Sequence, residues 1–291
     1  MDEQHGKQKA KEYYGQGAEA YIKQYQEGYE EYPANRIRLD FIIERLKKNN
    51  VKTVLDVGCG TCGPMIRLLQ EGFTVKGFDF SKEMIDEGKK ELAKSDYDPE
   101  LITLVDLENE AALPGETFDS IIALGVFPHI VNEEKALSNM AKLLRPSGLV
   151  FIEFRNSLFA AYTLNKYSLE FFLNDVIDLN SLPRDMREPV AHFYSERMKV
   201  DAPIKKENDK VAYADILTKF RNPLSIGSEL FNPCGFSVAD IHFYHYHALP
   251  PIFEQTYPKE FRELSLKMEK TSDWRGYLMA SAYVIEAKKV A

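Results

Sequence analysis

The feature that most constrains this chain is a regular alternation of short apolar runs with helix-like segments between residues 51 and 154. Five runs have the length and composition of buried strands, and they occupy residues 51–57, 73–78, 101–105, 118–126 and 149–154. Pro64, Gly72 and Ser81 mark starts and stops of the helices between them. Such alternation is typical of an α/β fold with a doubly wound, mostly parallel sheet.

A glycine-rich turn follows the first of these strands. Gly58, Gly60 and Gly63 stand where a strand leads into a helix, and glycine there lets the backbone approach a ligand closely. Asp79 ends the second strand, 19 residues after Gly60, at a position where an acid can bind ribose hydroxyls. This combination fits a nicotinamide dinucleotide and a nucleoside cofactor with a methionine moiety equally well. A tight turn without any ligand is the structural alternative.

Three further features favour the cofactor with a methionine moiety. Asp56 precedes the glycines, where it would repel a pyrophosphate but tolerates an ammonium group. Asp106 follows the third strand, and its carboxylate can accept a hydrogen bond from an adenine amino group. The fifth strand is introduced by the sequence Leu-Arg-Pro-Ser-Gly at residues 144–148.

Taken together, these segments resemble the successive motifs of the class I S-adenosylmethionine-dependent methyltransferase family, in its small-molecule type. The segments that carry the resemblance are residues 54–63, residues 78–81 with Met84, Asp106, residues 118–122 and residues 144–148. They span about residues 51–154. The resemblance implies a Rossmann-like sheet of seven strands with the last strand antiparallel, and apolar runs at residues 238–247 and 278–287 fit the two remaining strands.

The resemblance also implies S-adenosylmethionine as the cofactor, with S-adenosylhomocysteine as the product. Carried over position by position, the glycines would line the methionine and ribose, Asp79 would bind the ribose, and Asp106 would bind the adenine. The residues expected to bind the cofactor are Asp56, Gly58, Gly60, Asp79, Phe80, Met84, Asp106, Leu107, Leu124 and Tyr21. For Met84 the alternative is simple core packing, and for Asp106 it is a solvated loop position.

Candidate catalytic and acceptor-binding residues follow strands or lie near the N-terminus. His129 follows the fourth strand and could act as a general base. Strand alternation places His245 and His247 on one face of a late strand, opposite His242. The predicted catalytic residues are His129, Tyr14 and His245, and the predicted substrate-binding residues are Arg155, His247 and Tyr13. For each of them, an ordinary structural role is the alternative.

Four regions are expected. They are an N-terminal helical cover at residues 1–50, a cofactor-binding core at 51–154, an inserted cap or acceptor lid at 155–224, and the rest of the core at 225–291 with a small helical insertion at about 250–275. The net charge of -8 argues against a broad nucleic-acid or anionic-membrane surface. The first residues lack the apolar core of a secretory signal, and no apolar run approaches the roughly 18 residues of a membrane span. We therefore expect a cytoplasmic protein. The sequence does not indicate an oligomeric state.

The expected activity is methyl transfer to an oxygen or nitrogen atom of a small polar molecule, such as a sugar or a sugar nucleotide. Two alternatives remain open: a protein that binds the cofactor without catalysis, and a nicotinamide-dependent oxidoreductase. Cys59 and Cys62 have the spacing of a redox dithiol, but nothing else indicates a thioredoxin-like fold. No metal site is expected, because neither the cysteines nor the late histidines have a further ligand at suitable spacing.

Overall fold

The computed structural model describes residue 9 and residues 33–198, 218–270 and 272–290. A single sheet runs through it in the order β3-β2-β1-β4-β5-β8-β7, with β8 antiparallel to both of its neighbours and the other pairs in this order parallel. The strands are β1 (Thr53–Val57), β2 (Thr74–Asp79), β3 (Ile102–Leu104), β4 (Phe118–Ala123), β5 (Leu144–Asn156), β7 (Phe236–Tyr246) and β8 (Ala280–Lys289). The predicted seven-stranded, mostly parallel sheet is confirmed. One further strand, β6 (Phe220–Arg221), was not predicted and pairs with the end of β5.

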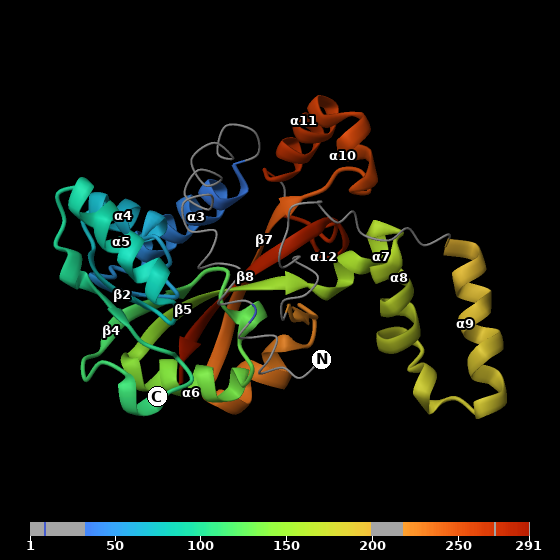
Figure 1. The fold of residues 1–291 in the computed structure, drawn as a ribbon, viewed down its shortest axis with the longest axis horizontal. Helices are drawn as coiled ribbons and strands as arrows, with labels where there is room; N and C mark the ends of the chain where they lie inside the picture. The colour runs from blue at the N-terminus through green and yellow to red at the C-terminus, as the bar shows by residue number, and fades with distance from the viewer. Residues whose placement is uncertain (1–8, 10–32, 199–217, 271, 291) are drawn as a thin grey trace.

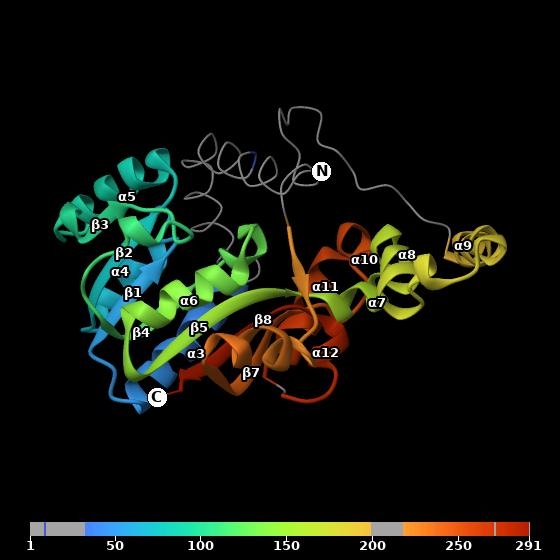
Figure 2. The ribbon, with the colours of Figure 1, turned by 90° about the horizontal axis from the view of Figure 1, so that it is seen from below.

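Helices cover both faces of the sheet (Figures 1 and 2). On one face, Ile42, Met65 and Leu92 come from three different helices and share one apolar cluster with β1, β4 and β8. On the other face, Met140 and Phe231 belong to a second cluster with β1, β4, β5 and β8. The helices of the first face are α3 (Ala34–Lys48), α4 (Gly63–Gln70) and α5 (Lys82–Lys94), and α6 (Glu133–Leu143) lies on the second. Both cores are therefore built around the same central strands.

The helix boundaries follow the capping residues. The Ser81 hydroxyl accepts a hydrogen bond from the backbone N–H of Met84 at 3.3 Å and begins α5, as predicted. The Asn132 side chain caps α6 in the same way, with a bond of 2.9 Å from Lys135 N–H. Gly72 follows α4 with a φ of +89°, a conformation that suits glycine. These capping residues thus determine where the helices begin and end.

The strands differ at their ends from the predicted ranges, and β4 and β5 differ most. β4 stops at Ala123 rather than at residue 126, and the chain then passes through Gly125 at a φ of +75°. β5 runs from Leu144 to Asn156 rather than over residues 149–154, because β4 and β8 pair with it on both sides. The extension includes Arg155 and Asn156, both of which pair with β6, and Arg155 also pairs with Ala282 of β8.

The segment after β5 forms a helical arm that projects beyond the carboxyl end of that strand (Figures 1 and 2). Its helices are α7 (Ala160–Thr163), α8 (Lys166–Phe171) and α9 (Arg184–Met198). None of the residues of α9 is buried. A smaller group of helices lies between β7 and β8, namely α10 (Ile252–Thr256), α11 (Pro258–Met268) and α12 (Gly276–Met279). A π-helix, Gly227–Phe231, precedes β7. Among the described helices, none has both the length and the apolar character needed to cross a membrane.

Candidate functional site

A cavity opens where the strand order of the sheet reverses, between the carboxyl ends of β1 and β4. This is the position at which open α/β sheets bind ligands, because the loops after the two strands diverge there. The cavity has an empty volume of about 770 Å³, which includes space open to solvent. It is lined by Val57, Gly58, Gly60, Phe78, Asp79, Phe80, Ser81, Met84, Val105, Asp106, Leu107, Leu124, Gly125, Val126, His129 and Ile130.

The glycine-rich turn after β1 forms one wall of this cavity. The backbone N–H groups of Gly58 and Cys59 both donate to the carbonyl of Phe78, at 2.8 and 3.1 Å, so the turn is tied to β2. Gly58 has a φ of +68°, and a Cβ atom there would lie 2.3 Å from a methyl carbon of Val126. Only glycine fits at this position, because any side chain would meet both backbone strain and a steric clash.

Asp79 is held in a fixed orientation at the end of β2. Its Oδ2 accepts a hydrogen bond from the N–H of Gly60 at 3.0 Å, and its Oδ1 accepts one from the N–H of Ser81 at 2.8 Å. The carboxylate is 7% exposed and lines the cavity. A buried carboxylate anchored by two backbone donors can accept further hydrogen bonds from two neighbouring hydroxyl groups of a ligand.

A second wall combines apolar side chains with one acid. Met84 and Leu107 are each only 4% exposed and face the cavity together with Phe80. Asp106 is half-buried beside them, and its Oδ1 accepts the N–H of Glu108 at 3.0 Å. A flat aromatic ligand with an amino group at its edge would match this wall, with the apolar side chains on its faces.

Asp56 lies beneath the glycine-rich turn in an adjoining cavity that shares Gly58, Gly60 and Leu124 with the first. It is 2% exposed, and its Oδ2 has no hydrogen-bond partner among the described residues. Burial, together with the nearby carboxylate of Asp79, raises the pKa of Asp56 to about 8. A buried carboxyl oxygen without a donor is costly, so this position is suited to a ligand that brings a positive charge or a donor.

The structure therefore brings nearly all of the predicted cofactor-binding residues together. Eight of them line the first cavity, and Asp56 lines the second. Tyr21 lies outside the described residues, as do Tyr13 and Tyr14. The predicted general base His129 lies in the first cavity, in a short helical turn that follows β4. Its role stays a prediction, but its position agrees with it.

A buried ion pair beside this site was not predicted. Arg38 of α3 and Glu153 of β5 form a salt bridge with both side chains 3% exposed, and Arg38 also donates to the hydroxyl of Tyr244 at 3.2 Å. Although burial opposes ionisation, Arg38 and Arg155 hold the pKa of Glu153 below its ordinary value, with help from the N–H of Gly125. Because Gly125 also lines the cavity, its hydrogen bond to Glu153 links this ion pair to the cavity wall. The only trace of this pair in the sequence is that each residue is a charged position within an otherwise apolar pattern, Arg38 in that of α3 and Glu153 in that of β5.

The three remaining predicted residues lie where β5 and β7 end. Arg155 is the penultimate residue of β5, and His245 and His247 have ring centroids 4.9 Å apart. His245 has a φ of +58° and its Nδ1 lies 2.9 Å from the hydroxyl of Ser281. Burial, together with the neighbouring His247 and Arg155, lowers the pKa of His245 to about 3. A histidine of such low basicity is a weaker general base than an ordinary one, so its predicted catalytic role gains no support from this geometry.

His247 is nearly enclosed by aromatic rings. Its ring centroid lies 4.8 Å from that of Phe159 and 5.5 Å from that of Phe261, and the side chain is 8% exposed. Neither ring nitrogen has a hydrogen-bond partner among the described residues. Burial lowers the pKa of His247 to about 4, so the ring is neutral near physiological pH. A neutral, unpaired imidazole can still donate one hydrogen bond to a ligand and accept another.

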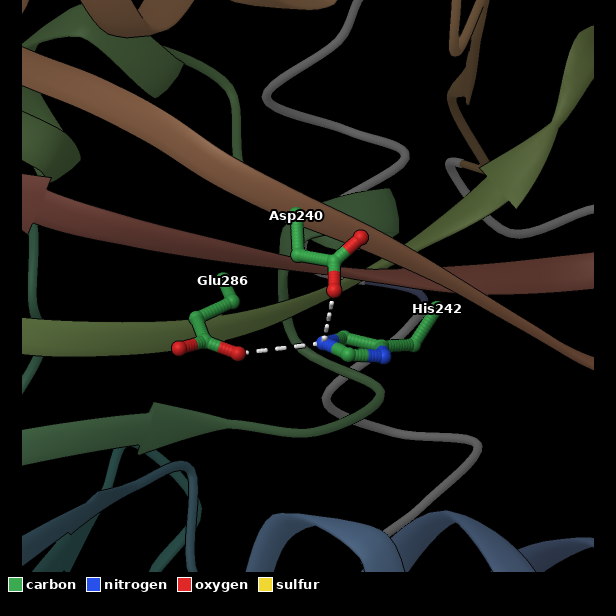
Figure 3. Close-up of side chains that lie close together, drawn as sticks. All are labelled: Asp240, His242 and Glu286. Atoms are coloured by element: carbon green, nitrogen blue, oxygen red, sulfur yellow. Dashed lines mark hydrogen bonds and ion pairs between the residues drawn. The ribbon is translucent and has the colours of Figure 1, made fainter. Parts of the chain in front are cut away.

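Asp240, His242 and Glu286 form a separate cluster on β7 and β8 (Figure 3). Each offers a potential metal-ligating atom within 4.8 Å of the others. However, Arg45 of α3 already donates to both oxygens of Glu286, at 2.7 and 2.9 Å, and Nε2 of His242 lies 3.1 Å from the same carboxylate. Although burial opposes ionisation, hydrogen bonds from His242 and Arg45 lower the pKa of Glu286 to about 2. A cation would have to displace Arg45, so we interpret this cluster as an ion pair that anchors α3 to the sheet.

Comparisons with known proteins agree with this site. A family model described as a methyltransferase domain matches residues 55–150. The ubiquinone biosynthesis O-methyltransferase of Rickettsia bellii is 30% identical over 145 residues, which cover 48% of this chain and 58% of that enzyme. The glycine N-methyltransferase of Mus musculus is 32% identical over 130 residues, which cover 40% of this chain and 44% of that enzyme. The chain thus spans about half the length of the curated relatives it matches.

Similarity of fold extends over nearly the whole chain. The structure of magnesium protoporphyrin IX methyltransferase from Synechocystis, solved with bound S-adenosylhomocysteine, has a TM-score of 0.55 and 15% identity, covering 98% of this chain and 99% of that one. An S-adenosylmethionine-dependent methyltransferase from Clostridium acetobutylicum has a TM-score of 0.55 and 13% identity, covering 93% and 99%. At these identities the likeness concerns the fold. Together with the match of a methyltransferase domain at residues 55–150, it agrees with the resemblance to the class I S-adenosylmethionine-dependent methyltransferase family.

Proposed function

We propose that this chain binds S-adenosylmethionine in the cavity at the ends of β1, β2 and β4 and transfers its methyl group to a small molecule. The observation that carries the proposal is the arrangement of three acids around one glycine-rich turn. Asp79 is anchored for hydroxyl groups, Asp106 stands beside an apolar wall, and the unpaired Oδ2 of Asp56 is buried next to the same turn. These three sites match a ribose, an adenine amino group and an ammonium group, in that order.

The residues present fit the cofactor in a second respect. Because Gly58 has no side chain, Val126 can pack against the turn, and both residues line the cavity. A pyrophosphate would fit poorly, because its negative charge would lie near the Asp79 carboxylate and it has no hydrogen-bond donor for the unpaired Oδ2 of Asp56. We therefore favour S-adenosylmethionine over a nicotinamide dinucleotide for this cavity.

When bound, S-adenosylmethionine supplies an activated methyl group whose carbon bonds to an acceptor oxygen or nitrogen while its bond to sulfur breaks, leaving S-adenosylhomocysteine. The protein's task is then to align the acceptor, which can contribute roughly 7–11 kcal/mol. We propose that His129 accepts the proton that the acceptor loses, because His129 lines the same cavity as Leu124 and Gly125. A general base of this kind contributes about 10²–10⁴-fold.

We infer that the acceptor is a small polar molecule held between the cofactor cavity and the helices after β5. Arg155, His245 and His247 lie at the carboxyl ends of β5 and β7, at the base of that region. Their neutral imidazoles and guanidinium group suit an acceptor with hydroxyl or carboxylate groups, such as a sugar or a sugar nucleotide. The relatives differ in their acceptors, one being a ubiquinone biosynthesis O-methyltransferase and another a glycine N-methyltransferase.

The test is a transfer assay with S-adenosylmethionine labelled in its methyl group and a panel of sugars, sugar nucleotides, amino acids and phenols. We expect labelled product with at least one polar acceptor. His129→Gln should lower kcat by about 10²-fold or more with an acceptor that must lose a proton, while Asp86→Asn, on the exposed side of α5, serves as a control. Labelling of only folded protein or RNA would contradict the small-molecule acceptor. Cofactor binding without transfer to any acceptor would favour a non-catalytic binding protein.

A further inference from the structure

His129 lies in a short loop between β4 and α6. The loop contains one 3₁₀ turn, Phe127–His129, in which the N–H of His129 donates to the carbonyl of Val126 at 2.9 Å. Such turns have poorer hydrogen-bond geometry than α-helices and occur in short pieces. The position of the imidazole in the cavity therefore depends on contacts that hold the loop from other parts of the chain.

Lys219 holds this loop through two of its carbonyl groups. The backbone N–H of Lys219 donates to the carbonyl of Pro128 at 2.8 Å, and its ammonium group donates to the carbonyl of Val131 at 2.7 Å. Pro128 precedes His129 directly, and Val131 follows it after one intervening residue. Lys219 is therefore bonded to the loop on both sides of the predicted general base.

Glu108 binds the same loop through its N–H groups. One carboxylate oxygen of Glu108 accepts a hydrogen bond from the N–H of Asn132 at 2.8 Å, and the other accepts one from the N–H of Val131 at 3.4 Å. Glu108 directly follows Leu107, which lines the cofactor cavity. A cation that binds the carbonyls and an anion that binds the N–H groups thus fix the loop to two other segments.

The strand that follows Lys219 is itself anchored. β6 pairs in parallel with the end of β5, where Phe220 lies opposite Arg155. The hydroxyl of Tyr283, a buried residue of β8, donates to the carbonyl of Arg221 at 3.1 Å. Lys219 therefore reaches the loop of His129 from a fixed strand, and that strand also pairs with a predicted acceptor-binding residue.

A second contact of β6 holds the far end of the loop. Arg221 donates to both carboxylate oxygens of Glu133, the first residue of α6. The side chain of Glu133 is 3% exposed, so solvent screens this ion pair less than a surface pair. Lys219 holds the loop before and after His129, and Arg221 extends this hold to the start of α6.

We propose that Lys219 is a positioning residue for the transfer step, and that it holds His129 at the cofactor cavity in a fixed relation to Arg155. The proposal rests on the proposed function of the cavity and on the role proposed for His129. A general base must lie within about 2.6–3.2 Å of the group whose proton it accepts. A misplacement of about 1 Å can lower a rate by about 10²-fold. Lys219 acts through the place that it gives to His129 and takes no part in the proton transfer itself.

The experiment measures the accessibility of His129 in the full chain, with S-adenosylhomocysteine as the probe of the cavity. Diethyl pyrocarbonate acylates accessible imidazoles, and peptide mapping gives the rate of this reaction at His129. In the wild type, saturating S-adenosylhomocysteine should slow the reaction, because His129 lines the cavity that the ligand fills. Lys219→Met should lose this protection. Calorimetry should show that it still binds the ligand, because the acids assigned to the ligand belong to β1, β2 and the loop after β3.

Three variants serve as controls. Lys219→Arg keeps a charged donor and should keep the protection. Lys76→Met removes a lysine whose ammonium group also makes a bond of 2.7 Å, to the exposed Glu116, and it should behave like the wild type. Thermal unfolding shows whether each variant is folded before it is labelled. Lys219→Gln, which keeps a polar but shorter and uncharged side chain, should lose the protection as well and replaces Lys219→Met if that variant does not fold.

Kinetics with an acceptor from the panel above give a second readout. Lys219→Met should lower kcat by about tenfold to a hundredfold and change the KM for S-adenosylmethionine little, because the loss concerns the placement of His129. In a His129→Gln background, the same substitution should have no further effect on kcat, since the group that Lys219 positions is absent.

Full protection of His129 in Lys219→Met, or an equal loss of kcat with and without His129, would overturn the proposal. Loss of ligand binding in both uncharged variants would overturn it too, because Lys219 would then support the cavity rather than His129. The same holds if wild-type protein binds S-adenosylhomocysteine without any protection of His129. A folded wild-type protein that binds no S-adenosylhomocysteine would instead refute the proposed function, on which this inference depends.

Discussion

The buried carboxyl of Asp56 gives the sharpest quantitative prediction, because its pKa couples folding, pH and ligand binding. Burial and the Asp79 carboxylate raise the pKa of Asp56 from 3.8 to about 8. At neutral pH the folded protein therefore holds Asp56 mainly protonated, while the unfolded chain holds it ionised. Folding takes up a proton between these two pKa values, so the stability of the protein falls as the pH rises through this window.

Asp56→Asn should remove this cost, because an amide of the same shape does not ionise. Each pH unit above 3.8 contributes about 1.4 kcal/mol, so the variant should exceed the wild type in stability by about 4 kcal/mol at pH 7, as an upper value. The difference should vanish near pH 4 and level off above about pH 8. Urea unfolding of both proteins at several pH values measures it directly.

The same substitution should weaken the binding of S-adenosylhomocysteine, because its ammonium group loses a charged acceptor. A hydrogen bond to a charged group is worth about 1.5–3 kcal/mol, so we expect a loss of roughly tenfold to a hundredfold. Binding to the wild type below pH 8 should also release a proton, seen as a heat that depends on the buffer. Asp86→Asn, on the exposed side of α5, serves as the control. A stability difference that is independent of pH, or unchanged affinity, would refute this reasoning.

Three further predictions concern residues that hold the turn, the helices and the sheet around the site in place. Gly58→Ala should abolish measurable cofactor binding and destabilise the fold by about 1–3 kcal/mol, because its Cβ would lie 2.3 Å from a neighbouring carbon, whereas Gly115→Ala, with open space around it, should be silent in thermal unfolding and titration. Arg38→Met should cost about 3–5 kcal/mol in urea unfolding, because it leaves the buried Glu153 without its partner; a change below 1 kcal/mol would show that the ion pair is dispensable. Glu286 has a pKa lowered to about 2, so its stabilising contribution is complete above its ordinary pKa and should be lost as the pH falls from about 4.5 to about 2; urea unfolding should therefore show a steeper loss of stability over this range in the wild type than in Glu286→Gln, and equal slopes would contradict it.

The cofactor side of the site could be predicted from sequence because each of its residues belongs to a short local pattern. Gly58 and Gly60 leave a strand for a helix, and Asp79 ends the next strand, so strand order alone brings them together. Parallel neighbours place their carboxyl ends at one edge of the sheet. The pattern of apolar runs therefore predicted both the fold and the positions of these side chains.

The supporting contacts could not be predicted in the same way. Arg38 and Glu153 are 115 residues apart, and only the packing of α3 against the sheet pairs them. Arg45 and Glu286 are 241 residues apart, and an irregular register between Val238 and Asp240 shifts the strand that carries His242. Distances of this kind depend on tertiary packing, which residue periodicity does not encode.

The acceptor side was predictable only in part. Alternation along β7 correctly placed the rings of His245 and His247 next to each other. It gave no sign that His245 would adopt a positive φ or that burial would lower the pKa of both rings. The predicted contributions of Tyr13, Tyr14 and Tyr21 lie outside the described residues and stay predictions.

The most direct test of the central claim is a calorimetric titration of the purified protein with S-adenosylhomocysteine, with NAD and an Asp79→Ala variant beside it. The account predicts saturable binding of S-adenosylhomocysteine to the wild type, none of NAD, and a large loss of affinity in the variant, since Asp79 lies in the cavity with its carboxylate oriented by two backbone donors. Saturable binding of NAD, or no binding of S-adenosylhomocysteine by well-folded wild-type protein, would contradict it.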